Sequence, residues 1–315
     1  MHAVECTRGG HRESIHPFSA VVVERGAVTW SVGDDVSTFW RSACKPFQLS
    51  NSLGHLNGLS ARDFSDDELA IGAASHSGQP QHVALVEKLL ARFGLSAEQL
   101  QCGGHPPMHE SSAKRVETPG NLHNNCSGKH TFMLAACKAQ GWDLDYRAPT
   151  HPLQVKNRAL LEGLGGHALQ LGVDGCSIPT FFAPLSAMAR TWSRLAEAMS
   201  DDADSTLGRI GLAMHRSPFF VSGDERLDLR VTQGANEWLA VKVGAEGLFC
   251  IARPEKRQGI AVKVHSGNAD VAAVAVKWVL AQQGVNVQGE WPWSVVKNVR
   301  GVEVGARAVV TPLSP

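Results

Sequence analysis

Segments rich in β-branched residues lie toward both ends of the chain, and this arrangement limits the possible folds more than any other feature. Two of them flank Arg25-Gly26, a dipeptide typical of a hairpin turn. Three more follow in the last third of the chain. The predicted strands are 19–24, 27–32, 238–243, 248–252 and 260–265. Strands at both ends around a different middle predict that the terminal strands share one antiparallel sheet.

Between these groups the hydrophobic spacing is helical, with Gly- and Pro-rich joints. The predicted helices are 67–74, 82–92, 129–140, 151–163, 183–199 and, after the last strand, 269–282. We therefore predict an α+β fold in which an antiparallel sheet formed from both chain ends is flanked by helices on both faces. Neither a linker nor a repeat interrupts the pattern. Residues 1–315 are expected to form a single domain with a helical middle at about 42–235.

Composition excludes several classes of partner. The chain of 315 residues balances 30 Lys and Arg against 30 Asp and Glu, so it lacks the basic surface that nucleic acids and anionic membranes attract. No stretch approaches the ~20 apolar residues of a membrane-spanning helix, and the first residues lack the apolar segment of a signal peptide. We expect a cytoplasmic protein that acts on a small, near-neutral molecule.

The spacing Ser-x-x-Lys is the first chemical motif. It places a hydroxyl and an amine on one helix face, where a neutral amine can accept the hydroxyl proton as the oxygen attacks a carbonyl. Free lysine titrates near ~10.4, so burial, a second cation or a helix N-terminus must lower its pKa. The motif begins at Ser42, Ser111 and Ser294. Only Ser42, with Lys45, follows strands and opens a helix, so this pair is the predicted one.

Two further elements strengthen this choice. Serine acyl-enzymes of the β-lactamase kind place a Lys-x-Gly strand beside the nucleophile, and this chain has Lys242-Val-Gly244 in a predicted strand. A turn of small residues around Ser75 supplies a second hydroxyl for a bound amide. The three elements together predict an active site that contains Ser42, Lys45, Ser75 and Lys242.

Two of the seven cysteines, Cys126 and Cys176, lie in polar turns that contain glycine. An odd number of cysteines in a chain of this size argues against a disulfide scaffold. Two thiolates and a nitrogen donor suit Zn²⁺, but the double Cys-x-x-Cys spacing of a strong zinc site is absent. Reduced, partly buried thiols are the alternative interpretation.

Charged residues adjoin both of these turns. Lys129-His130, at a predicted helix start, is typical of a cradle for a carboxylate. Asp174 precedes Gly175, and either holds the ammonium group of a substrate or caps a turn. Both interpretations of Asp174 stay open at this point.

Six short motifs run through the chain from about Gly9 to Pro312. They are Arg41-Ser-Ala-Cys-Lys-Pro46, Ala74-Ser-His-Ser-Gly78, Cys102-Gly-Gly-His-Pro106, Asn125-Cys-Ser-Gly-Lys-His130, Asp174-Gly-Cys-Ser-Ile-Pro179 and Lys242-Val-Gly-Ala245. In this order they resemble the rhizobial-type L-asparaginase family. The resemblance implies a fold akin to serine β-lactamases and glutaminases, and a homodimer.

The resemblance also implies roles for individual residues. It implies two serine-lysine pairs in one pocket, Ser42 with Lys45 and Ser75 with Lys242. Zinc is held in that family by the residues that match Cys126, Lys129 and Cys176, with water completing the shell. The residues that match Arg41, His130 and Asp174 orient the substrate and the site. Cys44, Gln79 and Gln81 depart from the family pattern, and none of the three removes a catalytic group.

The sequence therefore predicts an L-asparaginase, which hydrolyses the side-chain amide of L-asparagine to L-aspartate and ammonia. The predicted route is acylation of a serine followed by hydrolysis of the ester, with lysine carrying the proton and amides near Ser42 or Gly244 forming the oxyanion hole. Ser42 has the stronger motif, and Ser75 is its rival as nucleophile. The alternatives are a glutaminase, a β-lactam-reactive serine acylase, or a zinc-dependent binding protein with a degenerate pocket.

Overall fold

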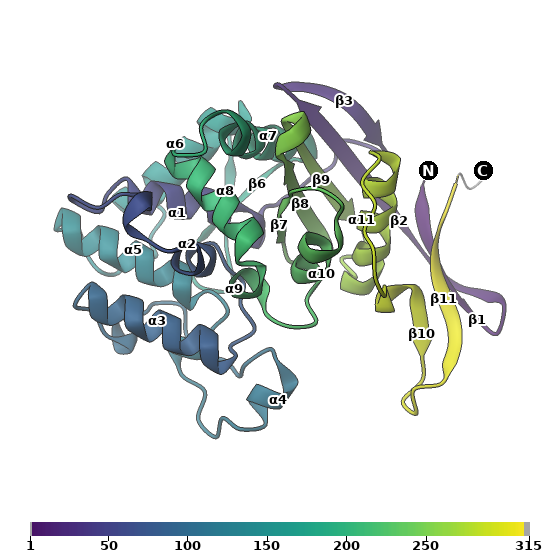
Figure 1. Ribbon diagram of the computed structural model, residues 1–315, viewed down its shortest axis with the longest axis horizontal. Coiled ribbons are helices and arrows are strands. Elements are labelled where there is room, and N and C mark those ends of the chain that lie inside the picture. The colour runs from purple at the N-terminus through teal and green to yellow at the C-terminus, as the bar shows by residue number, and fades with distance from the viewer. Residues whose placement is uncertain (1, 312–315) are drawn as a thin grey trace.

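A computed structural model describes residues 2–311, so Met1 and residues 312–315, including the Pro312 limit of the resemblance, lie outside the described part. An eight-stranded sheet runs in the order β10-β11-β1-β2-β9-β8-β7, with β3 also paired to β2 (Figure 1). Its strands are β1 Ala3–Arg8, β2 His11–Glu24, β3 Ala27–Val32, β7 Ala240–Val243, β8 Leu248–Arg253, β9 Gln258–Val264, β10 Val295–Lys297 and β11 Glu303–Val310. All the pairings are antiparallel.

The sheet joins the two ends of the chain, as predicted. Strand β2 pairs with β9 along seven residues, from Phe18 opposite Val264 to Glu24 opposite Gln258. Strand β1 pairs with β11, which brings the terminal strands together as well. The predicted α+β class, with one antiparallel sheet formed from both chain ends, is therefore confirmed.

Helices cover both faces of this sheet. They are α1 Lys45–Leu53, α2 Asp66–Gly72, α3 Pro80–Arg92, α4 Glu110–Ala113, α5 Ser127–Gln140, α6 Pro152–Gly165, α7 Leu185–Asp201, α8 Thr206–Arg216, α9 Pro218–Ser222, α10 Leu227–Gly234 and α11 Ala269–Gln282. Helix α7 packs on β2, β8 and β9 on one side, and α11 packs on β9 and β11 on the other (Figure 1). Every residue of β8 and β9 is buried because both faces are covered.

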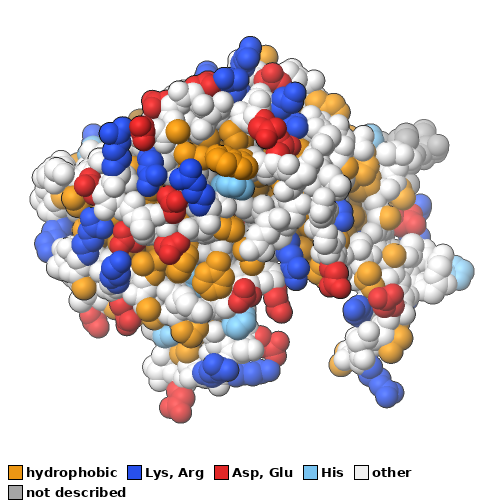
Figure 2. Space-filling view, viewed as in Figure 1, with side chains coloured by type: hydrophobic (Ala, Val, Ile, Leu, Met, Phe, Trp, Pro, Cys, Tyr) orange, Lys and Arg blue, Asp and Glu red, His pale blue; other side chains and the backbone are white. Residues whose placement is uncertain are grey.

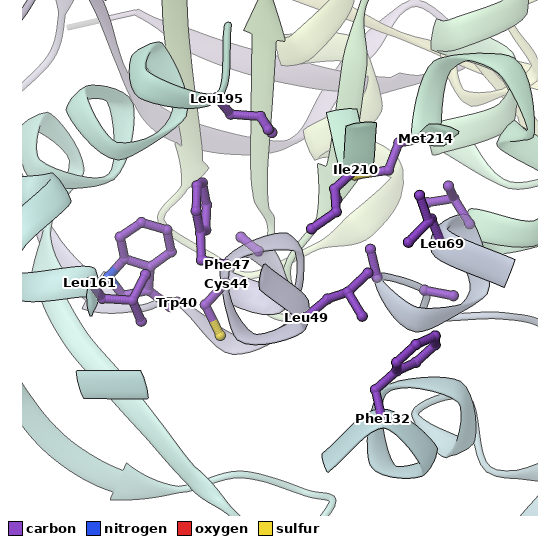
Figure 3. Packing of buried hydrophobic residues seen from close by; sticks show 14 of the residues in the cluster. Trp40, Cys44, Phe47, Leu49, Leu69, Phe132, Leu161, Leu195, Ile210 and Met214 are labelled. Atoms are coloured by element: carbon purple, nitrogen blue, oxygen red, sulfur yellow. The ribbon is translucent and has the colours of Figure 1, made fainter. Parts of the chain in front are cut away.

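Alternation along β2 divides the core into two hydrophobic clusters. Val21 and Val23 belong to the cluster that faces α7, while Ala20 and Val22 belong to the cluster that faces α11. The first cluster also encloses α1. Figure 3 shows Phe47 of α1 among side chains of neighbouring helices that include Leu195 of α7. Helix α1 is thus held from several sides, which fixes the position of its first residue, Lys45.

Two short strands lie in the region predicted to be helical, and a third lies just before it. They form a second antiparallel sheet in the order β4-β6-β5, with β4 Ser37–Phe39, β5 Gln170–Val173 and β6 Pro179–Pro184. Sequence spacing did not predict these strands because they are only three to six residues long and two of them contain or adjoin Pro or Gly. The small sheet matters, because β4 leads into Ser42 and the β5–β6 turn carries Cys176.

Two further features bear on the predicted partners. Figure 2 shows Lys and Arg side chains intermingled with Asp and Glu over the face in view, without a large patch of one sign. Within residues 2–311 no helix is long and apolar enough to cross a membrane.

A glycine allows α7 to pack closely on β9, and replacing it tests this contact. A Cβ atom at Gly259 would lie 1.9 Å from the Ala189 carbonyl oxygen and 2.2 Å from the Ser193 nitrogen. We expect Gly259→Ala to lower the free energy of unfolding by about 3 kcal/mol, because backbone atoms cannot move aside cheaply. Urea denaturation measures this change.

Gly163→Ala in α6 is the matched control. A Cβ atom at Gly163 meets nothing within 4 Å, so this substitution is expected to stabilise the protein by roughly 0.5–1 kcal/mol. Equal unfolding midpoints for the two variants would contradict the close packing of α7 on β9.

Candidate active site

Ser42 sits at a sharp turn between the small sheet and α1. Trp40 is buried and donates its backbone N–H to the Phe181 carbonyl at 2.8 Å, which anchors the end of β4. Arg41 follows with a φ of 46°, in the left-handed region that non-glycine residues rarely occupy. A short 3₁₀ turn, Arg41–Cys44, then leads into α1 at Lys45. Ser42 is therefore partly buried in the turn that opens the helix, as predicted from the spacing.

Ser75 follows α2 in a segment held by its backbone. The Ser75 N–H donates to the Val221 carbonyl at 2.9 Å, and the His76 N–H donates to the Asn125 carbonyl at 3.1 Å. The Ser77 hydroxyl donates to the Ser222 carbonyl at 2.7 Å. These contacts leave Ser75 3% exposed and fix its hydroxyl at one position of the site.

Lys45 connects the first predicted motif to the second. Its amine is buried and donates to the Ser75 hydroxyl at 2.8 Å and to the Ala74 carbonyl at 2.6 Å. Within residues 2–311 no hydrogen bond joins Lys45 to Ser42, or Lys242 to Ser75. The observed hydrogen bond therefore joins Lys45, from the first predicted pair, to Ser75, from the second.

Lys242 is the second buried amine, and its environment favours the neutral form. It lies on β7 with no exposed surface, donates to the Val243 carbonyl at 3.1 Å, and is 3.6 Å from Asp228 Oδ1. Burial lowers the pKa of Lys242 to about 8. The Asp228 carboxylate acts to raise this pKa, and the charge of the nearby Lys45 acts to lower it. A lysine that loses its proton near physiological pH is suited to proton transfer.

Both serines line one cavity of about 400 Å³. Its walls include the start of α10, with Arg226 and Asp228, and the turn between β7 and β8 around Gly244. The amines of Lys45 and Lys242 are not on this wall but are buried behind it. The cavity has the size of a small-molecule site, and its hydroxyls adjoin buried amines.

The predicted metal ligands form a buried cluster of their own. Cys126 caps the start of α5, and Cys176 lies in the turn between β5 and β6. The Lys129 amine donates to Cys176 Sγ at 3.2 Å. The two cysteines also interact, and a hydrogen bond from Cys176 lowers the pKa of the Cys126 thiol well below its usual value. The structure thus brings the three predicted ligands together.

The donor chemistry of this cluster suits Zn²⁺, because two thiols and one amine are soft or borderline ligands. The described part of the chain contains no group of three His, Cys, Asp or Glu side chains arranged to hold a metal ion. The predicted set supplies only two residues of those types, since its third member is Lys129.

Arg41 and Asp174, both predicted to orient the substrate, form an ion pair with each other. Arg41 Nε lies 2.6 Å from Asp174 Oδ1. Burial alone would raise the pKa of Asp174, but Lys129 and Arg41 outweigh burial and hold it below its usual value. The pair ties the Ser42 turn to the Cys176 turn, and neither residue is on the cavity wall.

His130, the third predicted substrate residue, is fully buried. Its Nδ1 atom lies 2.6 Å from the hydroxyl of Tyr146, and its Nε2 atom has no hydrogen-bond partner in the described part of the chain. Burial, with Lys129 and Lys45 nearby, holds the pKa of His130 well below its usual value, so the ring is neutral. His130 also lies away from the cavity wall.

The three departures from the family pattern have different surroundings. Cys44 donates its thiol to the Arg41 carbonyl, and burial raises its pKa to about 12, so the thiol stays protonated. Gln79 donates to the Asp224 carboxylate at 2.8 Å and accepts the Asp224 N–H at 3.0 Å. Gln81 is exposed. Gln79 therefore holds the segment that leads to the cavity wall at Arg226.

Sequence reasoning missed three residues of this region. Asp228 pairs with Lys242, Arg226 lies on the cavity wall, and Tyr146 contacts His130. The alternation of charged and apolar residues at the start of α10 looks like an ordinary solvated helix face, so it carries no signal. Tyr146, the one tyrosine in the chain, has no motif around it.

Serine-dependent amide hydrolysis needs a nucleophilic hydroxyl and a nearby base. The two serines on the cavity wall and the buried amines behind them supply these groups. The chain belongs to the L-asparaginase II family, whose family model matches residues 4–309. The resemblance drawn from the six motifs is thereby confirmed. No curated relative was found.

Three solved structures have a distantly similar fold. Mglu is 13% identical, with 87% of this chain and 62% of Mglu covered and a TM-score of 0.46. A β-lactamase from Mycobacterium bovis is 12% identical, with 84% and 94% covered and a TM-score of 0.44. An octameric penicillin-binding protein homologue from Pyrococcus abyssi is 14% identical, with 84% and 73% covered and a TM-score of 0.43. This chain therefore spans less than two thirds of Mglu.

Proposed function

We propose that the protein is an L-asparaginase that uses its serines and buried lysines to hydrolyse the side-chain amide of L-asparagine. One observation carries this proposal: the Lys45 amine lies 2.8 Å from the Ser75 hydroxyl, and Ser75 shares a cavity wall with Ser42. A proton acceptor must lie within hydrogen-bond reach of the hydroxyl that it serves, and Lys45 meets that condition for Ser75. The choice of L-asparagine as the substrate rests on membership of the L-asparaginase II family.

In the proposed mechanism Ser42 attacks the amide carbonyl. Ser42 is the more accessible of the two serines and lies in the first turn of a 3₁₀ helix, where a backbone N–H has no acceptor within the helix. That N–H is placed to stabilise the oxyanion. The Gly244 N–H is already bonded to the Leu248 carbonyl at 2.7 Å, so a second donor near Gly244 must be a neighbouring backbone amide.

Protons move through Ser75 and the two lysines. The Ser75 hydroxyl, bonded to Lys45, passes the proton of Ser42 to a neutral amine, and the amine returns it to the departing ammonia. Two cations close together in a buried site disfavour each other, so one amine loses its proton first. Lys242 is that amine, so the two lysines together carry one proton. While that proton resides on Lys242, the Lys45 amine is neutral and accepts the proton of Ser42 through the Ser75 hydroxyl. Water then hydrolyses the aspartyl ester by the same route.

Arg41, Asp174 and His130 have supporting roles in this proposal. The Arg41–Asp174 ion pair holds the strained turn that carries Ser42, and His130 packs on Tyr146 beside the buried lysines. We propose that these three residues orient the site, including the side of it that the substrate meets.

We further propose that Cys126, Lys129 and Cys176 hold Zn²⁺. Bound there, zinc would tie the start of α5 to the β5–β6 turn, and would lower the pKa of a water molecule that completes its shell. The homodimeric state and the cytoplasmic location remain predictions from the sequence.

A parallel assay tests the substrate. Ammonia release is measured with L-asparagine and L-glutamine, and ring opening with a chromogenic β-lactam. Turnover of asparagine above the other two supports the proposal, whereas preference for glutamine or the β-lactam would establish one of the rival acylases. Calorimetric binding of asparagine without turnover would establish a binding protein instead.

Acyl-enzyme mapping separates the two serines. We expect Ser42→Ala and Ser75→Ala each to lower kcat by about 10³-fold or more, because each removes a hydroxyl that the reaction needs. After an acid quench during turnover of asparagine, peptide mass spectrometry should find aspartyl ester on Ser42 in the wild type and none in Ser42→Ala. An ester on Ser75 in the Ser42 variant would make Ser75 the nucleophile.

The pH profile tests Lys242. Below pH about 8 its amine is charged and cannot take a proton, so kcat/KM should rise with pH and level off above that value. Lys242→Met should abolish this rising limb and lower kcat/KM by about 10²–10⁴-fold. Lys256→Met, which removes an exposed lysine, should retain the limb. An unchanged limb in the Lys242 variant would exclude Lys242 as the titrating group.

Metal analysis tests the zinc proposal independently of activity. The purified protein should contain about one Zn²⁺ per chain, and Cys176→Ser should lose the metal and unfold at a lower temperature. Cys6→Ser, at a buried cysteine on β1, should keep the metal. Metal-free wild-type protein would refute the site. Full activity after complete removal of bound zinc by chelation would restrict the metal to a structural role.

A further inference from the structure

The start of α10 presents an unexplained charged pair to the cavity. Arg226 is the N-cap residue of this helix and Asp228 lies in its first turn, two positions further on. Both line the cavity that contains Ser42 and Ser75. The proton path described above uses neither residue, and Asp228 has so far appeared only as the neighbour of Lys242.

Asp228 has one carboxylate oxygen without a partner. Its Oδ1 atom accepts the Val243 N–H at 2.8 Å and faces the Lys242 amine at 3.6 Å. Its Oδ2 atom has no hydrogen-bond partner among residues 2–311, and the side chain is only 1% exposed. A buried carboxylate oxygen without a donor is costly, and native proteins rarely leave one. Because Asp228 lines the cavity, a donor on a bound ligand can supply the missing hydrogen bond.

Arg226 is the complementary feature. Arg226 is the only lysine or arginine among the described residues that line the cavity. Within residues 2–311 its guanidinium group makes neither an ion pair nor a side-chain hydrogen bond, whereas Asp270 on the same wall is paired with Arg307 at 3.1 Å. An arginine fork that is not already engaged is well suited to hold a carboxylate through two parallel hydrogen bonds.

We propose that Arg226 and Asp228 bind the head group of an α-amino-acid substrate. The Arg226 guanidinium holds the α-carboxylate, and Asp228 Oδ2 accepts a hydrogen bond from the α-ammonium group. These two substrate groups share one carbon atom, and Arg226 and Asp228 line the same cavity, so one head group can meet both. The inference rests on the proposed function and adds to it the means by which a free amino acid is recognised.

This assignment has a direct consequence for specificity. With the head group held at α10, the side-chain amide extends toward the two serines on the shared wall. An amide that lacks either head-group charge leaves Arg226 or Asp228 without its partner. Sites built on polar contacts of this kind reject incomplete substrates by large factors.

Truncated substrates test the proposal on the wild-type protein. Succinamate is asparagine without its amino group, and 3-aminopropanamide is asparagine without its carboxylate. Ammonia release should give a kcat/KM for each that is about 100-fold or more below that of asparagine. Equal kcat/KM values for asparagine and both truncated amides would overturn the proposal while leaving the amidohydrolase function intact.

Variants then assign each charge to its residue. Arg226→Gln should lower kcat/KM for asparagine by about 100-fold and leave that for 3-aminopropanamide nearly unchanged. The ratio of the two kcat/KM values, which measures the preference for a substrate with a carboxylate, should therefore fall to near one. Asp228→Asn should bring the ratio of kcat/KM for asparagine to that for succinamate close to one, because this ratio measures the preference for a substrate with an amino group. Because each result is a ratio of two substrates on one variant, an effect of Asp228 on Lys242 cancels.

Two control variants test whether the loss of any nearby charge changes these kcat/KM ratios. Arg230→Gln removes an exposed arginine from the same helix, and Glu246→Gln removes a different carboxylate from the cavity wall. Both should keep the wild-type ratios. Ratios that change equally in the controls and in the Arg226 and Asp228 variants would overturn the assignment.

A wild-type protein that releases no ammonia from asparagine would refute the proposed function rather than this inference alone. Calorimetric titration with asparagine then decides the inference. Binding that Arg226→Gln abolishes and Arg230→Gln retains would support the head-group site, whereas no binding, or equal binding by both variants, would refute it.

Discussion

The hydrogen bond from the Lys45 amine to the Ser75 hydroxyl is the contact on which the rest of the site depends. It joins the start of α1 to the segment after α2, and Lys45 is buried so completely that its amine has only protein partners. A buried ammonium group is costly unless it is well bonded, and a nearby second cation raises that cost. The tightly packed surroundings of α1, visible in Figure 3, are what hold the amine in this position.

The large sheet explains how distant segments meet at this point. Because β2 pairs with β9 and β9 with β8, the C-terminal third of the chain forms one wall of the cavity, and β7 brings Lys242 behind it. The small sheet has the same role on the other side, since β4 and the β5–β6 turn place Arg41 beside Asp174. The site is therefore assembled from many loops on two rigid sheets, which suits a reaction that needs fixed groups.

Sequence patterns predicted much of this arrangement and missed identifiable parts of it. Long periodic segments such as α7 and α11, and the buried strands β8 and β9, were predicted close to their observed bounds because hydrophobic periodicity is strong there. The serines, lysines and cysteines were found because their motifs carry chemistry. Which lysine meets which serine was not predictable, since it depends on the packing of α1 on α2. Arg226 and Asp228 lie in no motif, and only the cavity reveals them.

Replacing Lys45 tests the central claim most directly. Lys45→Met keeps a long side chain of similar shape in the buried position but removes the amine, so ammonia release from saturating L-asparagine isolates the role of that group. With near-ultraviolet circular dichroism showing native packing in both proteins, we expect the wild type to turn over asparagine and Lys45→Met to lose about 10³-fold or more in kcat. Turnover within about tenfold of the wild type in a natively folded Lys45→Met protein would contradict the account.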